Sequence, residues 1–197
     1  MSKLIIFTLL SLFIAAAAHA DSLHGFIVRH GSQRFLQIQS GDQPATALKI
    51  AAATPQLETN LSKLKDGDFI VARGTICPDG NSVQIQSIES LGLAALVGTW
   101  VNERSEVYEF RDFSQLTLYV PAADGKSPVV KAGDFNYAVT PDEGSRYSIF
   151  VSNNLSVTLG SLEFQKRHLK MTVIDPQTGQ VSSTMTLSPF AAPQTLK

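Results

Sequence analysis

The sequence predicts a protein built mainly of β-strands, with a single helix. Three observations lead to this fold class. Short runs in which apolar and polar residues alternate recur along most of the chain, and alternation is the pattern of a half-buried strand. Gly, Pro, Asn and Asp separate these runs, as turn residues do. Only residues 54–64 space their leucines as one face of a helix does.

The first twenty residues have the three parts of a secretory signal peptide. Lys3 gives a basic start, a short apolar run follows, and Ala18-His19-Ala20 has the A-x-A form of a cleavage site. The run 4–18 is shorter than the roughly 20 apolar residues that a membrane-spanning helix needs. We therefore expect cleavage after Ala20 and a soluble mature protein in the periplasm or the medium, with no membrane span.

Charge and cysteine content narrow the classes of function. Without Lys3 the chain has 15 Lys and Arg against 17 Asp and Glu, a formal charge of −2. This balance gives no electrostatic reason to expect nucleic acid, anionic lipid or a strongly acidic ligand. Cys77 is the only cysteine, so no intramolecular disulfide is possible and the fold must depend on its hydrophobic core.

The chain is expected to divide near residue 95 into two parts. Residues 21–95 carry five strand-like runs and the helix, whereas 96–190 carry strands and turns only, before a short tail at 191–197. No low-complexity tract lies between the two parts, so we expect them to pack together. In the first part the predicted strands are 25–30, 33–40, 45–53, 69–76 and 82–90.

The predicted helix has clear start signals. Thr54 is an N-cap residue, and Pro55 fits the first helical position, where its missing N–H is no loss. Leu57, Leu61 and Leu64 are four and three residues apart and so share one face. The helix is therefore expected to pack this face onto the strands.

The order of three strands, a helix and two strands is that of an OB-fold, a small Greek-key barrel. The segment 61–76, LSKLKDGDFIVARGTI, resembles the passage from helix to fourth strand in OB-fold domains. The resemblance covers residues 24–93 and implies a five-stranded barrel with one helix. It does not imply a particular ligand.

Alternation also predicts a polar face on the first part. Glutamines should line this face, with an arginine nearby, and it suits a protein partner, a neutral hydroxyl-bearing ligand or plain solvent. Six basic and six acidic residues in 23–93, with only three aromatic residues, argue against a nucleic-acid surface. The candidate residues are Arg29, Gln37, Gln39, Gln84 and Gln86.

The second part opens with Leu96-Val97-Gly98-Thr99-Trp100, which resembles the Gly-x-Trp opening of lipocalin-like barrels. In that family the tryptophan closes the barrel floor, so the resemblance implies an antiparallel β-barrel over residues 96–190. The predicted strands that follow are 107–111, 115–120, 135–140, 146–152, 155–164, 168–175 and 180–189.

Aromatic residues concentrate in this second part. In a lipocalin-like barrel some of them would line a pocket for a small apolar molecule, whereas in a filled barrel they would form the core. Both interpretations stay open at this point. The candidate ligand-binding residues are Trp100, Tyr108, Phe110, Tyr119, Tyr137 and Tyr147.

Residues capable of catalysis or metal binding form no recognisable motif. His24 and His30 share a strand face, but a zinc site needs three or four ligands, so we favour exposed histidines. Cys77 has no neighbouring His or Cys in the sequence and is expected to be a plain strand-end residue. We therefore expect no cofactor, no metal and no catalytic residues.

Together these observations predict an exported, non-enzymatic binding protein. Its ligand would be a small apolar molecule in the second barrel, or an envelope protein at the first. Two alternatives remain: a structural or assembly subunit of the cell envelope, or a hydrolase whose carboxylates come from separate loops. The carboxylates considered for the hydrolase are Glu103, Glu109, Asp112, Asp134 and Asp142.

Overall fold

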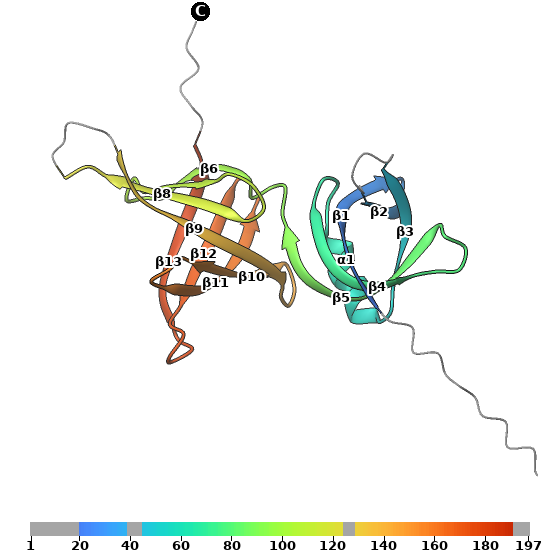
Figure 1. The fold of residues 1–197 in the computed structure, drawn as a ribbon. Helices are drawn as coiled ribbons and strands as arrows, with labels where there is room; N and C mark the ends of the chain where they lie inside the picture. Colours follow the sequence, from blue (N-terminus) through green and yellow to red (C-terminus); the bar gives the residue numbers. More distant parts are fainter. Residues whose placement is uncertain (1–19, 39–44, 124–128, 191–197) are drawn as a thin grey trace, which may run out of the picture.

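The computed structural model describes residues 20–38, 45–123 and 129–190 (Figure 1). Residues 1–19 of the predicted signal peptide (1–20), Gln39 and the tail at 191–197 lie outside the described residues. Within the described ranges the chain forms thirteen strands and one helix, and no helix there is long and apolar enough to cross a membrane. The predicted class, a mainly β protein with barrels and one helix, is confirmed.

Five strands close into a first barrel. Strand β1 pairs with β2 and with β4, β2 pairs with β3, and β5 pairs with β3 and β4, so the ring is complete. The β3–β5 pair is parallel and the other pairs are antiparallel. The bounds are β1 Asp21–His30, β2 Gln33–Ile38, β3 Thr46–Ala52, β4 Phe69–Ile76 and β5 Ser82–Gly92.

Helix α1 (Pro55–Lys63) lies between β3 and β4, as predicted. The Oγ1 atom of Thr54 accepts a hydrogen bond from the backbone N–H of Leu57 at 3.2 Å, which satisfies one of the free donors of the first turn. Leu57 and Leu61 are buried against the barrel, and so is Leu64 immediately after the helix. The apolar face therefore closes one side of the first barrel.

Eight antiparallel strands close into a second barrel. Neighbours in the chain pair from β6 to β13, and β13 pairs back with β6 through Trp100 and Pro189. Fully buried aliphatic side chains such as Ile149, Leu162 and Leu187 fill the inside. The bounds are β6 Gly98–Val101, β7 Val107–Phe110, β8 Gln115–Pro121, β9 Val129–Pro141, β10 Arg146–Ser152, β11 Val157–Gln165, β12 His168–Ile174 and β13 Val181–Pro189.

Strand β1 begins at Asp21 rather than at residue 25, and the largest difference from a predicted range is in β9. It begins at Val129 rather than at residue 135, because the β8–β9 hairpin continues its pairing as far as Pro121 and Val129. A bulge between Leu118 and Tyr119 interrupts this pairing, which hides the alternation that sequence analysis depends on.

Besides the chain connection at residues 93–97 (Figure 1), a strand pair, a hydrogen bond and a pair of stacked rings join the two barrels. Leu91 of β5 pairs with Val139 of β9, which links the two barrels into one continuous sheet. The Nζ atom of Lys63 donates to the carbonyl of Asp142 at 2.8 Å. Phe113, in the β7–β8 turn, stacks on Phe69 of the first barrel, with ring centroids 5.8 Å apart.

Candidate binding groove at the junction of the two barrels

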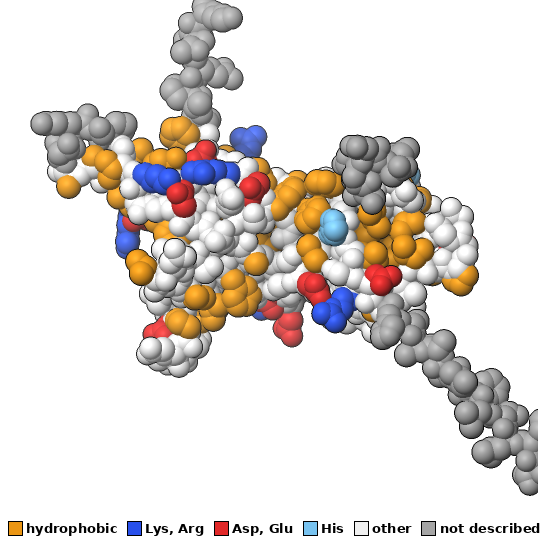
Figure 2. All heavy atoms as spheres, in the orientation of Figure 1, with side chains coloured by type: hydrophobic (Ala, Val, Ile, Leu, Met, Phe, Trp, Pro, Cys, Tyr) orange, Lys and Arg blue, Asp and Glu red, His pale blue; other side chains and the backbone are white. Residues whose placement is uncertain are grey.

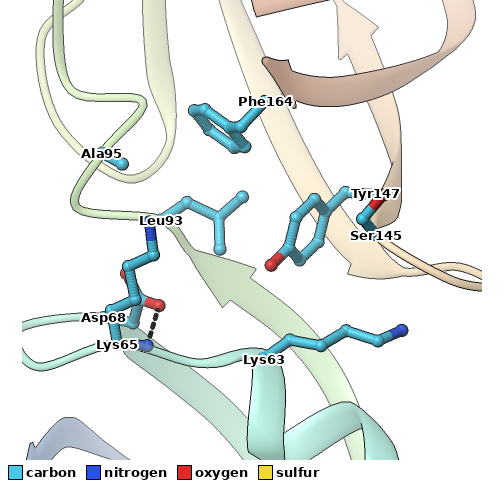
Figure 3. A pocket seen from close by; sticks show the side chains of 8 residues that line it. All are labelled: Lys63, Lys65, Asp68, Leu93, Ala95, Ser145, Tyr147 and Phe164. Carbon is cyan, nitrogen blue, oxygen red and sulfur yellow. Dashed lines mark hydrogen bonds between the residues drawn. The ribbon is translucent and has the colours of Figure 1, made fainter. Parts of the chain in front are cut away.

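Two neighbouring pockets form a groove where the barrels meet, which we call the junction groove. The inner pocket holds about 210 Å³, and its walls include Lys63, Lys65, Asp68, Leu93, Tyr147 and Phe164 (Figure 3). The outer pocket holds about 710 Å³, and its walls include Lys65, Trp100, Phe164, Lys166, Arg167 and His168. Lys65, Ala95 and Phe164 line both pockets, so the two are continuous.

Asp68 fixes the wall that the first barrel contributes. Its carboxylate accepts hydrogen bonds from the backbone N–H groups of Lys65, at 2.7 Å, and Ala94, at 2.9 Å. Burial raises the pKa of this carboxyl above its ordinary value, although both hydrogen bonds oppose the shift. Asp68 therefore ties the loop after α1 to the connection between the barrels, and so positions Lys65 and Ala95.

Aromatic rings and an aliphatic side chain form the apolar part of the groove. The rings of Phe164 and Tyr147 meet edge to face, with centroids 6.1 Å apart, and Leu93 lies beside them (Figure 3). Trp100 is held in place because its Nε1–H donates to the carbonyl of Leu96 at 2.8 Å. Burial, with a smaller effect from the charge of Asp68, raises the pKa of Tyr147, so its hydroxyl stays neutral at physiological pH.

The polar rim of the groove is mostly cationic. Four Lys and Arg side chains and His168 line it, against the single carboxylate of Asp68. Within the described part of the chain, Lys65, Lys166 and Arg167 take part in no ion pair. The arginines at 34, 73 and 111 each face a carboxylate instead. Lys65 is close enough to Asp68 for its charge to oppose the rise in the pKa of that carboxyl, so Asp68 compensates part of the positive charge and leaves an excess in the groove.

The turn between β11 and β12 has an unusual backbone conformation at Lys166. Gln165 pairs with His168, so Lys166 and Arg167 alone make the turn. Lys166 has a φ of 51°, in the left-handed region that glycine and asparagine normally fill, because a Cβ atom there crowds the backbone. Lys166 thus stands where the local backbone favours glycine or asparagine, and such conflicts cluster at functional sites.

No protein-family model, curated protein or solved structure matches the chain.

The predicted aromatic candidates fall into three groups. Trp100 and Tyr147 line the junction groove. Tyr108, Phe110 and Tyr137 are buried in the core of the second barrel, where Phe110 and Tyr137 meet edge to face. Tyr119 points outward instead, and its hydroxyl donates to Glu109 at 3.0 Å.

The predicted polar face is spread over different strands of the first barrel. Gln37 is exposed on β2, and Gln84 and Gln86 are exposed on β5. The guanidinium of Arg29 is engaged elsewhere, because it donates to the carbonyls of Ser62 at 3.2 Å and Leu64 at 2.5 Å. Arg29 thereby satisfies backbone acceptors at the end of α1.

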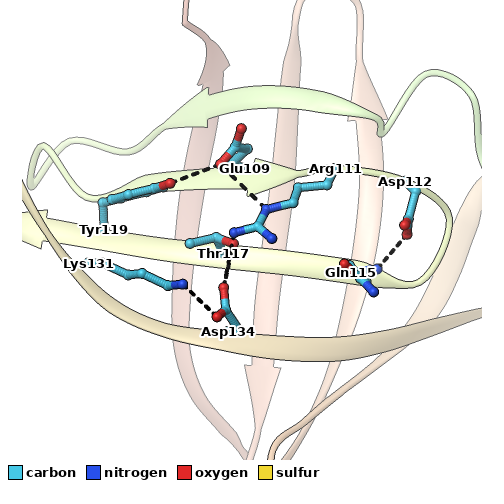
Figure 4. Close-up of polar contacts among 8 residues, drawn as sticks. All are labelled: Glu109, Arg111, Asp112, Gln115, Thr117, Tyr119, Lys131 and Asp134. Atoms are coloured by element: carbon cyan, nitrogen blue, oxygen red, sulfur yellow. Dashed lines mark hydrogen bonds and ion pairs between the residues drawn. The ribbon is translucent and has the colours of Figure 1, made fainter.

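Two of the carboxylates considered for hydrolysis come together on the outer face of the second barrel (Figure 4). Arg111 lies 3.8 Å from Glu109 and 3.1 Å from Asp134, and Lys131 lies 2.6 Å from Asp134. Hydrogen bonds from Lys131 and Thr117 hold the pKa of Asp134 below its ordinary value. A general acid needs a raised pKa, whereas the pKa of Asp134 is lowered, so Asp134 is not suited to act as a general acid.

The two histidines predicted to be exposed and the cysteine predicted to be a plain strand-end residue lie apart from one another. His24 and His30 are both exposed on β1, beside Phe69 and Phe35 respectively. Cys77 is a free, half-buried thiol. Among the described residues, no group of three or more His, Cys, Asp or Glu gathers as metal ligands would.

A second apolar surface lies over the first barrel, where Figure 2 shows hydrophobic side chains around a histidine. Phe26 is 42 % exposed and meets Phe69, with ring centroids 5.2 Å apart. Phe113 reaches this cluster from the second barrel and lies 6.1 Å from Phe26. The cluster therefore contributes to the contact between the barrels and leaves one ring open to solvent.

Of the residues that line the groove, the sequence predicted only Trp100 and Tyr147; those missed include Lys65, Phe164, Lys166, Arg167 and His168. One local signal was available for three of them. Residues 165–168 form a tight turn without the Gly, Asn or Asp that such turns normally contain, and this absence marks an unusual turn.

Proposed function

We propose that this protein is an exported, non-enzymatic binding protein whose ligand site is the junction groove. The outer pocket carries the proposal, because its volume of about 710 Å³ falls in the ordinary range of small-molecule sites. Its walls also combine aromatic surface with a few polar groups, as such sites do. Export is part of the proposal and rests on the signal-like pattern of the first twenty residues.

The strand orders support two fold families as the framework of this binding protein. The ring β1-β2-β3-β5-β4, with a helix between β3 and β4, is the arrangement expected of an OB-fold. Eight antiparallel strands that begin with Gly98-Thr99-Trp100 suit a lipocalin-like barrel. In the proposal, each barrel contributes one wall of the groove, and neither barrel needs an open interior.

The test is native mass spectrometry of protein isolated gently from its host's envelope fraction. Ala95 lines both pockets and is exposed, so Ala95→Phe should fill the groove without touching the core. Ala138→Phe is the matched control, because Ala138 is exposed on β9 and does not line the groove. A ligand adduct that is present in wild type and Ala138→Phe but lost in Ala95→Phe is the expected result. An adduct that survives Ala95→Phe would place the ligand elsewhere.

A second candidate function is the binding of an envelope protein at the aromatic cluster. The observation that favours it is Phe26, an exposed ring beside Phe69 on the face of a sheet. A photo-reactive residue in place of His24 is a suitable cross-linking probe, because His24 lies beside Phe69 of the aromatic cluster. A cross-link to one envelope protein that disappears in Phe26→Ser would support this candidate, and equal cross-linking in both would count against it.

A further inference from the structure

We infer that the ligand of the junction groove is a small amphipathic anion. Lys65, Lys166 and Arg167 would hold its carboxylate or phosphate headgroup, and the rings of Phe164 and Trp100 would hold its apolar part. This inference rests on the proposed function, since it names the ligand class of the same groove.

The rim of the junction groove carries more cations than carboxylates. Cations from two distant segments, residues 63–65 and 166–168, meet across one groove. Their only ionised counterpart in the walls is Asp68, which already accepts two backbone hydrogen bonds and is 3 % exposed. The excess positive charge over a low-dielectric wall attracts anions from solution. An anionic headgroup would thus supply the partner that the rim lacks.

The backbone of the β11–β12 turn is in the left-handed conformation at Lys166. The left-handed conformation of Lys166 costs a residue with a side chain free energy that glycine would not lose. A turn selected for stability alone would carry Gly or Asn at this position. The stability of the turn therefore gives no reason for a lysine at position 166, whereas a role of its side chain in ligand binding would give one. A third small pocket of about 490 Å³ surrounds this turn, so the side chains of Lys166 and Arg167 border open space.

The apolar wall of the groove favours an amphipathic anion over a bare anion, because only the former has an apolar part that can cover it. Phe164 stands between the inner and outer pockets and lines both. It is only half-buried, although it is a large aromatic residue next to buried Leu93. An apolar ligand group that covers this ring would remove its remaining surface from water, which stabilises the complex in proportion to the area buried. Inorganic phosphate offers no such group.

Fluorescence titration tests this ligand class, because Trp100 is the only tryptophan and lines the outer pocket. The probe is dodecyl phosphate below its micelle concentration, and the two comparison probes are inorganic phosphate and dodecyl maltoside. We expect saturable binding of dodecyl phosphate that weakens with added salt. Inorganic phosphate should not saturate the signal, and dodecyl maltoside should bind at least about tenfold more weakly, as expected for the loss of one charge-assisted contact.

Variants of the rim separate an electrostatic role from a structural one. Lys166→Gly should weaken dodecyl phosphate binding by about tenfold while it raises the melting temperature, because glycine relieves the strained φ. Arg167→Gln should weaken binding to a similar extent. Lys49→Gln is the control, because Lys49 is an exposed cation on β3 that does not line the groove. If the turn had only a structural role, Lys166→Gly would raise the melting temperature without weakening the binding of dodecyl phosphate.

Two results would overturn the inference and can be told apart from failure of the proposed function. If dodecyl maltoside binds as tightly as dodecyl phosphate, or if Lys166→Gly and Arg167→Gln bind like Lys49→Gln, the ligand is not selected as an anion. In either case, loss of binding in Ala95→Phe would still leave the groove as the site. If Ala95→Phe binds every probe as wild type does, the groove itself is the wrong site.

Discussion

Gly92 and Phe113 form the contact whose disruption is predicted most sharply. Gly92 ends β5 and pairs with Phe69, and the ring of Phe113 occupies the space that a side chain at position 92 would need. A Cβ atom built on Gly92 would lie 2.4 Å from Cγ and 2.6 Å from Cβ of Phe113. Carbon atoms in contact are normally about 3.5 Å apart or more, so Gly92→Ala must displace Phe113 by about 1 Å.

The cost of this displacement follows from what Phe113 contacts. Its ring is stacked on Phe69 with an interplanar angle of 7°, and such pairs contribute about 0.5–1.5 kcal/mol beyond area burial. Overpacking a well-packed site typically costs about 1–3 kcal/mol. We therefore expect Gly92→Ala to lower the free energy of unfolding by about 2 kcal/mol. The φ of Gly92 is not in the left-handed region, so backbone strain adds nothing.

A double-mutant cycle measures this steric conflict directly. Urea unfolding is followed by far-UV circular dichroism for the whole chain and by Trp100 fluorescence for the second barrel. In a Phe113→Gly background the added methyl group meets neither the ring nor the Cβ atom of residue 113, so Gly92→Ala should change stability by less than about 0.5 kcal/mol or raise it. An equal cost of Gly92→Ala in both backgrounds would refute the proposed packing of Phe113 on Gly92.

Two further predictions concern the wall of the groove and the helix. The folded pKa of Asp68 lies above its unfolded value of 3.8, so the folded state binds more protons between these two values. Wild type should therefore lose stability relative to Asp68→Asn as the pH rises from 3.8 through the folded pKa. Urea midpoints of both proteins measured over this pH range test this, and a difference between the two midpoints that does not change with pH would contradict it. Thr54→Ala removes the N-cap hydrogen bond to Leu57 and should cost about 1 kcal/mol. Thr59→Ala, inside the same helix, should cost less. Thermal melts of the two variants and wild type measure both costs.

Much of the first barrel follows from local sequence alone. Val83 and Ile85 are buried and Gln84 and Gln86 are exposed, as strict alternation requires of a strand with one solvated face. Thr54 caps α1 as predicted, because an N-cap is a local interaction of a few neighbouring residues. Where the signal is local, the prediction and the structure agree.

Alternation cannot tell a pocket wall from a packed core, since both require apolar side chains on the inner face. This explains the spread of the six aromatic candidates. Phe110 and Tyr137 are buried in the core, Tyr147 reaches the junction groove, and Tyr119 lies on the outer face. The bulge after Leu118 adds to the difficulty, because it disturbs the alternation next to Tyr119.

The groove itself depends on contacts between distant parts of the sequence. Lys65, Ala95 and Lys166 come together only because the two barrels pack, and the β5–β9 pair that links them joins Leu91 to Val139. The formal charge of −2 for the chain without Lys3 gave no reason to expect an acidic ligand. Net charge does not describe how cations are distributed after folding, so a positive groove is compatible with a slightly acidic chain.

Amide chemical shifts measured during a titration with dodecyl phosphate test the central claim most directly, because they locate the ligand residue by residue. The account predicts that the amides of Lys65, Ala95 and residues 166–168 shift together and saturate at one stoichiometric ligand. The amides of Phe110 and Leu162, deep in the second barrel, should stay unchanged. Saturating shifts centred on Phe110 and Leu162 instead would contradict the account and place the ligand inside the barrel.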